Sequence, residues 1–408
     1  MKMKEIILFW VSFFCLVILF SGPGGAAEYT VTHSTDFTGP YAVIMKAVDQ
    51  GTKVYYAWWN EAVGAKLGIK LNFKQYETRY DPSVVASLWP GILAGDKPIA
   101  HVGLGGPDVA ALMKRLPQDK VPLFMGTASY GYEWSPNQWI FHFRPTYVHE
   151  GASFLTWAHK ELTPGRIIRT GYINTKASPA YVEGYTGLKK FAEANSTWNE
   201  CLEAEWVDMK PVSITNEMRR LARKKPDVIT MMGNTAHVLS AIRAQQELGI
   251  HIPILMASHN GIQMSALAAG NMKILEGHYE VEACDPGIDP NIPGARIYEE
   301  YRQKLGLETK WNMVSCQNGA AVVLLCRAIE RVAAKVGPSN ITGESIYQVM
   351  YERPFTEEEM LGLTNKLVFT KEAPFPLNEL KARITTVKDG KQVFKPKDWV
   401  PVVSVPKW

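Results

Sequence analysis

The first part of the chain alternates between short apolar strands and amphipathic helices. Residues 28–34, 69–77, 98–105 and 121–127 are short apolar or period-two runs, which predict strands. The segments between them carry apolar residues at helical spacing, as in 41–64, 82–95 and 107–116. This order of elements predicts a parallel sheet with helices on both faces.

A second series of the same kind follows residue 146. Helices are predicted at 147–162, 179–194, 215–226 and 235–249, and strands at 166–174, 201–209, 227–234 and 252–258. Residues 283–294 are rich in Pro, Gly and Asp, which indicates a linker or crossover. A long apolar helix is predicted at 313–337, and 382–387 and 391–394 form a predicted hairpin across Asp389-Gly390.

The N-terminus has the layout of a secretory signal peptide. Lys2 and Lys4 precede an apolar run at 6–20, and small residues follow as far as Ala27. A membrane anchor is the alternative, but the run is about 15 residues, shorter than the roughly 20 needed to span a bilayer. We therefore expect cleavage near Ala27, export to the periplasm, and a mature chain that is water-soluble and monomeric.

Charge and cysteine usage exclude several classes of function. Removing residues 1–27 leaves 42 basic and 39 acidic residues, a net charge of +3 without a basic block, so nucleic acid is not an expected partner. Neither the cysteines nor the histidines have metal-ligand spacing, so no metal or cofactor is expected. A disulfide between Cys201 and Cys284 is permitted in an oxidising compartment but is not required.

No catalytic constellation emerges from the motifs. The stretch 126–131, GTASYG, is similar to a nucleophile elbow, but its first glycine lies one residue too far from Ser129. The glycine-rich stretch 103–108 matches neither a dinucleotide fingerprint nor a phosphate-binding loop, and a tight turn explains it equally well. We expect no catalytic residue.

Small polar, amide and aromatic residues recur where predicted strands end. Because ligands of parallel sheets bind beyond the carboxyl ends of the strands, these residues predict a binding site made of neutral groups. The loop 33–42, HSTDFTGPYA, is either a turn with a helix cap or the first binding loop. The candidate ligand-binding residues are Thr38, Gly39, Tyr41, Gly105, Gly106, Thr127, Ala128, Ser129, Tyr181, Asn234, His259 and Asn260.

These stretches, in this order, resemble the type I periplasmic solute-binding proteins of the leucine/isoleucine/valine-binding class. The resemblance covers nearly all of the mature chain and rests on TGPYA, YETRYDPSVVASL, PIAHVGLGGPDVAAL, VPLFMGTAS, FHFRPTYVHEGASFLTWA, PDVITMMGNTAHVLSAIRAQQELGI and NGAAVVLLCRAIERVA. It implies two Rossmann-like lobes joined by a three-stranded hinge that closes on a ligand. By this resemblance, lobe 1 comprises 28–146 and 284–366, and lobe 2 comprises 147–283 with part of 367–408.

The resemblance also implies roles for the candidate residues. The first loop would offer backbone N–H groups at a helix N-terminus to a ligand carboxylate. Gly105 and Gly106 correspond to a loop where the family often uses a serine hydroxyl, so only backbone N–H groups remain there. Thr127, Ala128 and Ser129 match a second contact, and Tyr181 matches an aromatic contact of the second lobe.

The stretch 257–261, ASHNG, departs from the family pattern. Amino-acid binders of this family place an acidic residue near this loop to neutralise the ligand's ammonium group, whereas here His259 and Asn260 occupy it. Asp36 or Glu183 could supply a charge from elsewhere. We expect a ligand without an α-ammonium group: a carboxylic acid, an aromatic acid, or a neutral amide or polyol. It would be bound by a non-enzymatic protein that delivers it to an ABC permease complex. A periplasmic sensor and a secreted serine hydrolase are the alternatives.

Overall fold

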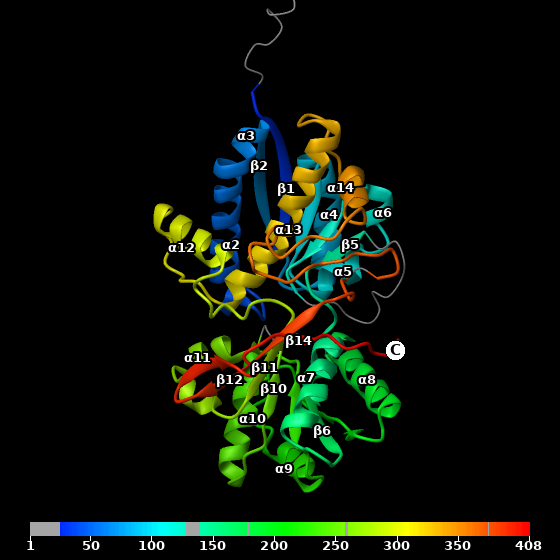
Figure 1. Ribbon diagram of the computed structural model, residues 1–408, viewed down its shortest axis with the longest axis vertical. Helices are drawn as coiled ribbons and strands as arrows, with labels where there is room; N and C mark the ends of the chain where they lie inside the picture. Colours follow the sequence, from blue (N-terminus) through cyan, green and yellow to red (C-terminus); the bar gives the residue numbers. More distant parts are fainter. Residues whose placement is uncertain (1–24, 128–138, 178, 258–259, 374) are drawn as a thin grey trace, which may run out of the picture.

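The computed structural model describes residues 25–127, 139–177, 179–257, 260–373 and 375–408. The chain forms two α/β lobes, stacked along the long axis of the molecule (Figure 1). The predicted signal peptide lies mostly outside the described residues. None of the helices within the described ranges is both long and apolar enough to cross a membrane.

The first lobe is built on a five-stranded parallel sheet of order β2-β1-β3-β4-β5. Its strands are β1 (Ala27–Thr35), β2 (Ile69–Glu77), β3 (Ala100–Gly103), β4 (Leu123–Met125) and β5 (Ile140–His142). The helical segments between them are α2 (Ala42–Trp59), the π-helix Asn60–Gly64, α3 (Ala65–Leu67), α4 (Pro82–Asp96), α5 (Gly106–Leu112) and α6 (Leu116–Asp119). The predicted order of strands and helices is confirmed, although β5 was not predicted.

The second lobe contains a mixed sheet of order β13-β12-β11-β10-β9-β6-β7, in which β8 pairs with β6 and β14 with β12. Its strands are β6 (Ile168–Asn174), β7 (Asn199–Cys201), β8 (Glu205–Trp206), β9 (Val228–Met231), β10 (Ile254–Met256), β11 (Tyr279–Glu282), β12 (Lys381–Lys388), β13 (Lys391–Phe394) and β14 (Val400–Pro401). Its helices are α7 (Tyr147–Glu161), α8 (Pro179–Ala194), α9 (Thr215–Arg223), α10 (Thr235–Leu248) and α11 (Ile262–Ala269), with a 3₁₀ turn at Met272–Leu275. The single strand predicted at 201–209 is wrong, because β7 and β8 are separate short strands.

The chain passes between the lobes three times: from β5 to α7, from β11 to α12 (Pro293–Lys304), and from α14 (Gly343–Val349) to β12 (Figure 1). The segment between the second and third passages includes the helix α13 (Met313–Val336), which packs on α2 of the first lobe. The Asn318 amide of α13 donates to the carbonyl of Val48 and to the hydroxyl of Thr52. The predicted helix at 313–337 is confirmed, and 19 of its 24 residues are buried, which explains its apolar sequence.

A buried ion pair stands at the first passage between the lobes. The Arg144 guanidinium donates two hydrogen bonds to the Glu150 carboxylate, at 2.9 and 2.7 Å, and both side chains are almost inaccessible. Glu150 also accepts the backbone N–H of Ala283, which lies in the second passage. The pair therefore ties two of the three connections together.

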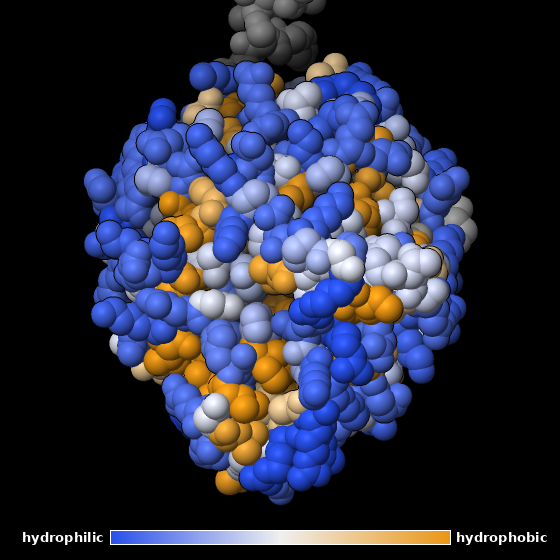
Figure 2. Space-filling view, turned by 60° about the horizontal axis from the view of Figure 1, so that its bottom comes forward, coloured by the Kyte–Doolittle hydropathy of each residue, from blue (hydrophilic) through white to orange (hydrophobic). Residues whose placement is uncertain are grey.

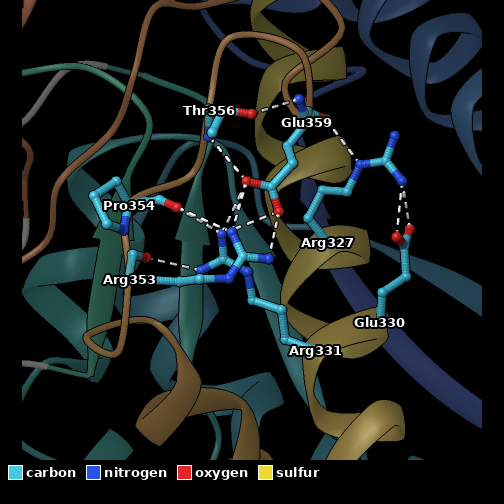
Figure 3. A network of polar contacts seen from close by, with 7 residues as sticks. All are labelled: Arg327, Glu330, Arg331, Arg353, Pro354, Thr356 and Glu359. Carbon is cyan, nitrogen blue, oxygen red and sulfur yellow. Dashed lines mark hydrogen bonds and ion pairs between the residues drawn. The ribbon is translucent and has the colours of Figure 1, made fainter.

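Polar contacts also anchor the chain that follows α14. Arg331 of α13 donates to the carbonyls of Arg353 and Pro354 and to the Glu359 carboxylate (Figure 3). Its guanidinium also lies 3.3 Å from the Phe355 ring centroid. This network fixes residues 353–359 against α13.

The molecular surface is mainly hydrophilic, with separate apolar patches on the face shown in Figure 2. Large apolar side chains that are exposed include Phe37 and Val43 in the first lobe and Val212 and Leu267 in the second. The four described cysteines, Cys201, Cys284, Cys316 and Cys326, are free thiols, so no disulfide links described residues.

Candidate functional site

The loop between β1 and α2 is held by the chain's own carboxylates. Asp36 Oδ2 accepts the backbone N–H of Tyr41 at 2.7 Å. The Glu77 carboxylate accepts the N–H of Phe37 at 2.8 Å and both the N–H and the hydroxyl of Thr38. The expectation that these backbone N–H groups are open to a ligand is therefore wrong at Phe37, Thr38 and Tyr41. Thr38 is exposed, and neither it nor Gly39 lines the cavity described next.

A cavity of about 50 Å³ lies behind this loop, mainly within the first lobe. A water needs about 10–15 Å³ on this measure, so the cavity has room for only a few waters. Its apolar wall consists of Ile44, Val48, Val102, Leu104 and Val314. Its polar wall consists of His33, Ser34, Thr35, Tyr41, Thr52, Gln75, Tyr80, Thr127, Tyr147, Gln317 and Asn318.

Three tyrosines line this cavity, and a fourth, Tyr181, bonds to one of them. Tyr41 and Tyr80 come from loops of the first lobe, and their ring centroids lie 4.5 Å apart. Tyr147 and Tyr181 belong to α7 and α8 of the second lobe. The hydroxyl oxygens of Tyr41 and Tyr181 lie 2.7 Å apart, a hydrogen bond that joins the lobes. Burial, followed by the neighbouring Tyr181 hydroxyl, raises the pKa of Tyr41 well above its usual value, so the group is a neutral hydroxyl.

The glycine-rich loop after β3 is also occupied by a side chain of the protein. The Asp108 carboxylate accepts the N–H groups of Leu104 and Gly105, at 2.8 and 3.0 Å. The expectation of a ligand-binding N–H is thus wrong at Gly105. Gly105 instead leaves room for Tyr80, because a Cβ at position 105 would lie 2.6 Å from that ring. Gly106 is the first residue of α5 and does not line the cavity.

Ser34, His101 and Asp108 form a buried cluster with the composition of a hydrolytic triad. The Ser34 hydroxyl lies 2.5 Å from Asp108 Oδ1 and 3.1 Å from His101 Nε2, while His101 Nδ1 pairs with the Thr32 hydroxyl. In a triad the carboxylate orients the histidine and the histidine takes the serine proton. Here the serine hydroxyl donates its hydrogen bond to the carboxylate and not to the histidine, so the cluster is a structural network and not an activated nucleophile.

Two of the predicted amides lie in loops of the second lobe, and Asn260 lines neither the cavity nor the groove described below. Asn234 caps α10: its Oδ1 accepts the N–H of His237, and its Nδ2 donates to the Met209 carbonyl. Asn260 is fully buried, and its Nδ2 donates to the carbonyls of Met231 and Gly233, which ties together the loops after β9 and β10. Ala128, Ser129 and His259 lie outside the described residues, so their positions are not described.

A second opening, a groove of about 360 Å³, runs between the lobes. One wall is formed by Pro40, Tyr41, Val43 and Ile44 of the first lobe, and the other by Lys210, Pro211, Asn234, Thr235 and Ala236 of the second. Tyr41 and Ile44 line both the groove and the cavity. These two side chains therefore separate the two spaces.

The two-lobe topology and the site between the lobes are consistent with the family that the sequence matches over most of its length. Residues 28–391 match the periplasmic binding protein family. This chain belongs to the periplasmic binding protein family. It is a family of solute-binding proteins and not of enzymes. No curated protein sequence matches the chain.

Solved structures with the same fold include other solute-binding proteins. A branched-chain amino acid ABC transporter protein of Thermus thermophilus with bound valine has a TM-score of 0.79 at 17% identity, over 93% of this chain and 98% of that one. A fatty acid ABC transporter substrate-binding protein of Thermomonospora curvata has a TM-score of 0.76 at 17% identity, over 92% and 93%. An ABC transporter substrate-binding protein of Aeropyrum pernix has a TM-score of 0.77 at 16% identity, over 93% and 97%. At these identities the likeness concerns the fold alone.

The lining of the site in this periplasmic binding protein is nearly free of charge. Burial lowers the pKa of His33, with a smaller contribution from His101, to about 3, so the ring is neutral at physiological pH. Lys210 is the one charged side chain among the described residues that line the cavity or the groove. No described acidic residue lines either space. The site can therefore hold a ligand by neutral hydrogen bonds, aromatic contact and one cation.

Sequence reasoning found part of this lining and missed the rest. Tyr41 and Thr127 line the cavity, Asn234 lines the groove, and Tyr181 joins them through Tyr41. Tyr80 was missed although it follows the predicted strand 69–77, so the strand-end rule applied more widely would have included it. Tyr147 was missed because it follows β5, which was not predicted. Gln317 was missed because it lies within an apolar helix whose pattern indicates only core.

Proposed function

We propose that this protein is the solute-binding component of an ABC importer and acts in the periplasm after cleavage near Ala27. It captures a small organic acid between its lobes and presents the closed form to a membrane permease. The proposed lobes are 28–146 with 284–366, and 147–283 with part of 367–408, in a monomer. Family membership and the fold support this role. The branched-chain amino acid class is one possibility within this role. The similar solved structures include one with bound valine and one described as a fatty acid transporter protein.

The proposed ligand is a carboxylic acid without an α-ammonium group, with an aliphatic or aromatic body. The observation that carries this proposal is the absence of any acidic side chain among the described residues lining the cavity and groove. An ammonium group enclosed there without a carboxylate partner would lose several kcal/mol of hydration free energy. The apolar wall and the tyrosine rings suit an apolar body.

Three acidic residues near the first loop and α13 line neither space, and each accepts at least one hydrogen bond from the protein, which supports the same ligand class. Asp36 and Glu77 accept backbone N–H groups of the first loop. Glu282 of β11 accepts a hydrogen bond from the Gln317 amide at 3.1 Å, so Gln317 stands at the cavity wall with that carboxylate behind it. Tyr41, Thr127 and Tyr181 are proposed as ligand contacts, with Ala128, Ser129 and His259 retained as further candidates.

A thermal-shift comparison of leucine and 4-methylpentanoate tests this proposal, because the two differ only in the ammonium group. Binding to the folded state stabilises it by RT ln(1 + [L]/Kd), so a ligand raises the melting temperature in a concentration-dependent way. We expect 4-methylpentanoate or benzoate to raise the melting temperature and leucine to leave it unchanged. A shift with leucine alone would place the protein with the amino-acid binders and overturn the proposed ligand class.

A further inference from the structure

The described lining of the interlobe groove carries one cation, Lys210. Lys210 lies in the loop between β8 and α9 and forms part of the second-lobe wall, opposite Tyr41 and Ile44. Its side chain is exposed. Both the groove and the cavity are walled by Tyr41 and Ile44, so movement of these two side chains would join the two spaces into one elongated site.

The ammonium group of Lys210 has no carboxylate partner within the described chain. Some exposed lysines are paired, such as Lys46 with Glu308 and Lys304 with Glu61, whereas others, such as Lys189, resemble Lys210 in having no ion pair among the described residues. The other polar residues of that wall are uncharged: the Asn234 amide caps α10 and donates to Met209, and Thr235 carries a hydroxyl. Lys210 is therefore the charged group in the described lining of the groove that can meet an anion.

We infer that Lys210 determines specificity by binding the carboxylate of an organic acid whose apolar body enters the cavity past Tyr41. This inference rests on the proposed function and adds the residue that recognises the acid group. It also divides the ligand between the lobes: the apolar body contacts the first-lobe wall, and the carboxylate contacts the second lobe. A ligand held at both ends would favour closure, because each lobe then contributes contacts that the other cannot replace.

The expected size of the effect follows from the position of Lys210. A fully exposed ion pair contributes little because water and salt screen it, whereas a charge pair between closing lobes is partly desolvated. We expect Lys210→Met to weaken binding of the acid about tenfold, which is about 1.4 kcal/mol. The corresponding primary amide carries no charge, so the substitution should change its affinity less than twofold.

Calorimetric titration of 4-methylpentanoate, benzoate and their primary amides into the full chain tests this inference. Lys189→Met is the matched control, because Lys189 is an exposed lysine of α8 in the same lobe and does not line the groove. We expect Lys210→Met to lose acid affinity and its salt dependence while Lys189→Met behaves as the wild type. Circular dichroism checks that both variants are folded.

The outcomes separate this inference from the proposed function. Suppose that the wild type binds an acid and that Lys210→Met either binds it equally well or loses affinity for the acid and the amide to the same extent. Lys210 then does not bind the carboxylate, and the proposed function is unaffected. If the wild type binds none of the acids, the proposed ligand class is wrong, and the proposed role of Lys210 is wrong as well.

Discussion

Single carboxylates decide which backbone groups of this site can meet a ligand. Asp36, Glu77 and Asp108 accept the N–H groups that begin two loops at the carboxyl edge of the first sheet. A pattern of glycine, proline and threonine indicates such loops, but it does not show which side chains accept hydrogen bonds from their N–H groups. The partners could not be predicted because Glu77 is 40 residues from Phe37 in the sequence and meets it only through the β1–β2 pairing.

Gly105→Ala tests the packing between the second loop and the tyrosine cluster. The Gly105 backbone is extended, so alanine is tolerated conformationally, but its Cβ would lie 2.6 Å from the Tyr80 ring. We expect overpacking to lower the free energy of unfolding by about 1 kcal/mol, measured by urea denaturation. In a Tyr80→Ala background the same change should cost nothing. Gly91→Ala on the open face of α4 should instead raise stability by about 0.5–1 kcal/mol. A loss that persists without Tyr80 would contradict this explanation.

At the scale of elements, periodicity was enough for most helices and strands. The hairpin predicted across Asp389-Gly390 is confirmed: β12 and β13 pair antiparallel, and both turn residues have positive φ, as a two-residue turn requires.

The strand β11 was not predicted, because Glu280 and Glu282 look like surface residues. Both are buried. Burial, and then the neighbouring Glu282, raises the pKa of Glu280 well above its usual value, which favours the neutral, protonated carboxyl in this buried position.

Glu359→Gln should loosen the segment that follows α14 from α13. Burial alone would raise the pKa of Glu359, but hydrogen bonds from Arg353, the Thr356 N–H and Arg331 outweigh it and lower the pKa to about 2. The carboxylate therefore stabilises the fold above the unfolded value of about 4.3, and this stabilisation is lost as the pH falls towards 2.

We expect Glu359→Gln to lower the free energy of unfolding by about 2 kcal/mol at pH 7, because the guanidinium of Arg331 loses its charged partner in a largely buried position. Urea denaturation at pH 7 and at successively lower pH measures the difference, which should shrink below pH 4. Glu358→Gln is the control, since Glu358 is exposed. A difference that is the same at pH 7 and pH 3 would show that charge is not the cause.

At the scale of the whole molecule, the two lobes could be expected from the number of strand–helix units, and the family resemblance added their crossovers. What could not be predicted is which groups touch across the lobes, since these contacts exist only after both lobes have folded. Tyr41 and Tyr181 are 140 residues apart, and their hydroxyls form a buried bond between the lobes. The Gln317–Glu282 bond is a second such link, from α13 to the end of β11.

Tyr181→Phe should shift the ligand-free protein towards an open form, because it removes one hydroxyl of the bond between the lobes. A buried hydrogen bond contributes about 1 kcal/mol, which corresponds to roughly a fivefold change in the ratio of closed to open molecules. Small-angle X-ray scattering should then show a larger radius of gyration for the free variant, and saturation with a bound acid should restore the wild-type value. Tyr172→Phe is the matched control: its buried hydroxyl donates to the Tyr181 carbonyl within the second lobe, so its loss should lower stability without opening the molecule. An equal radius of gyration for free Tyr181→Phe and free wild type would mean that closure rests on the ligand and not on this pair of hydroxyls.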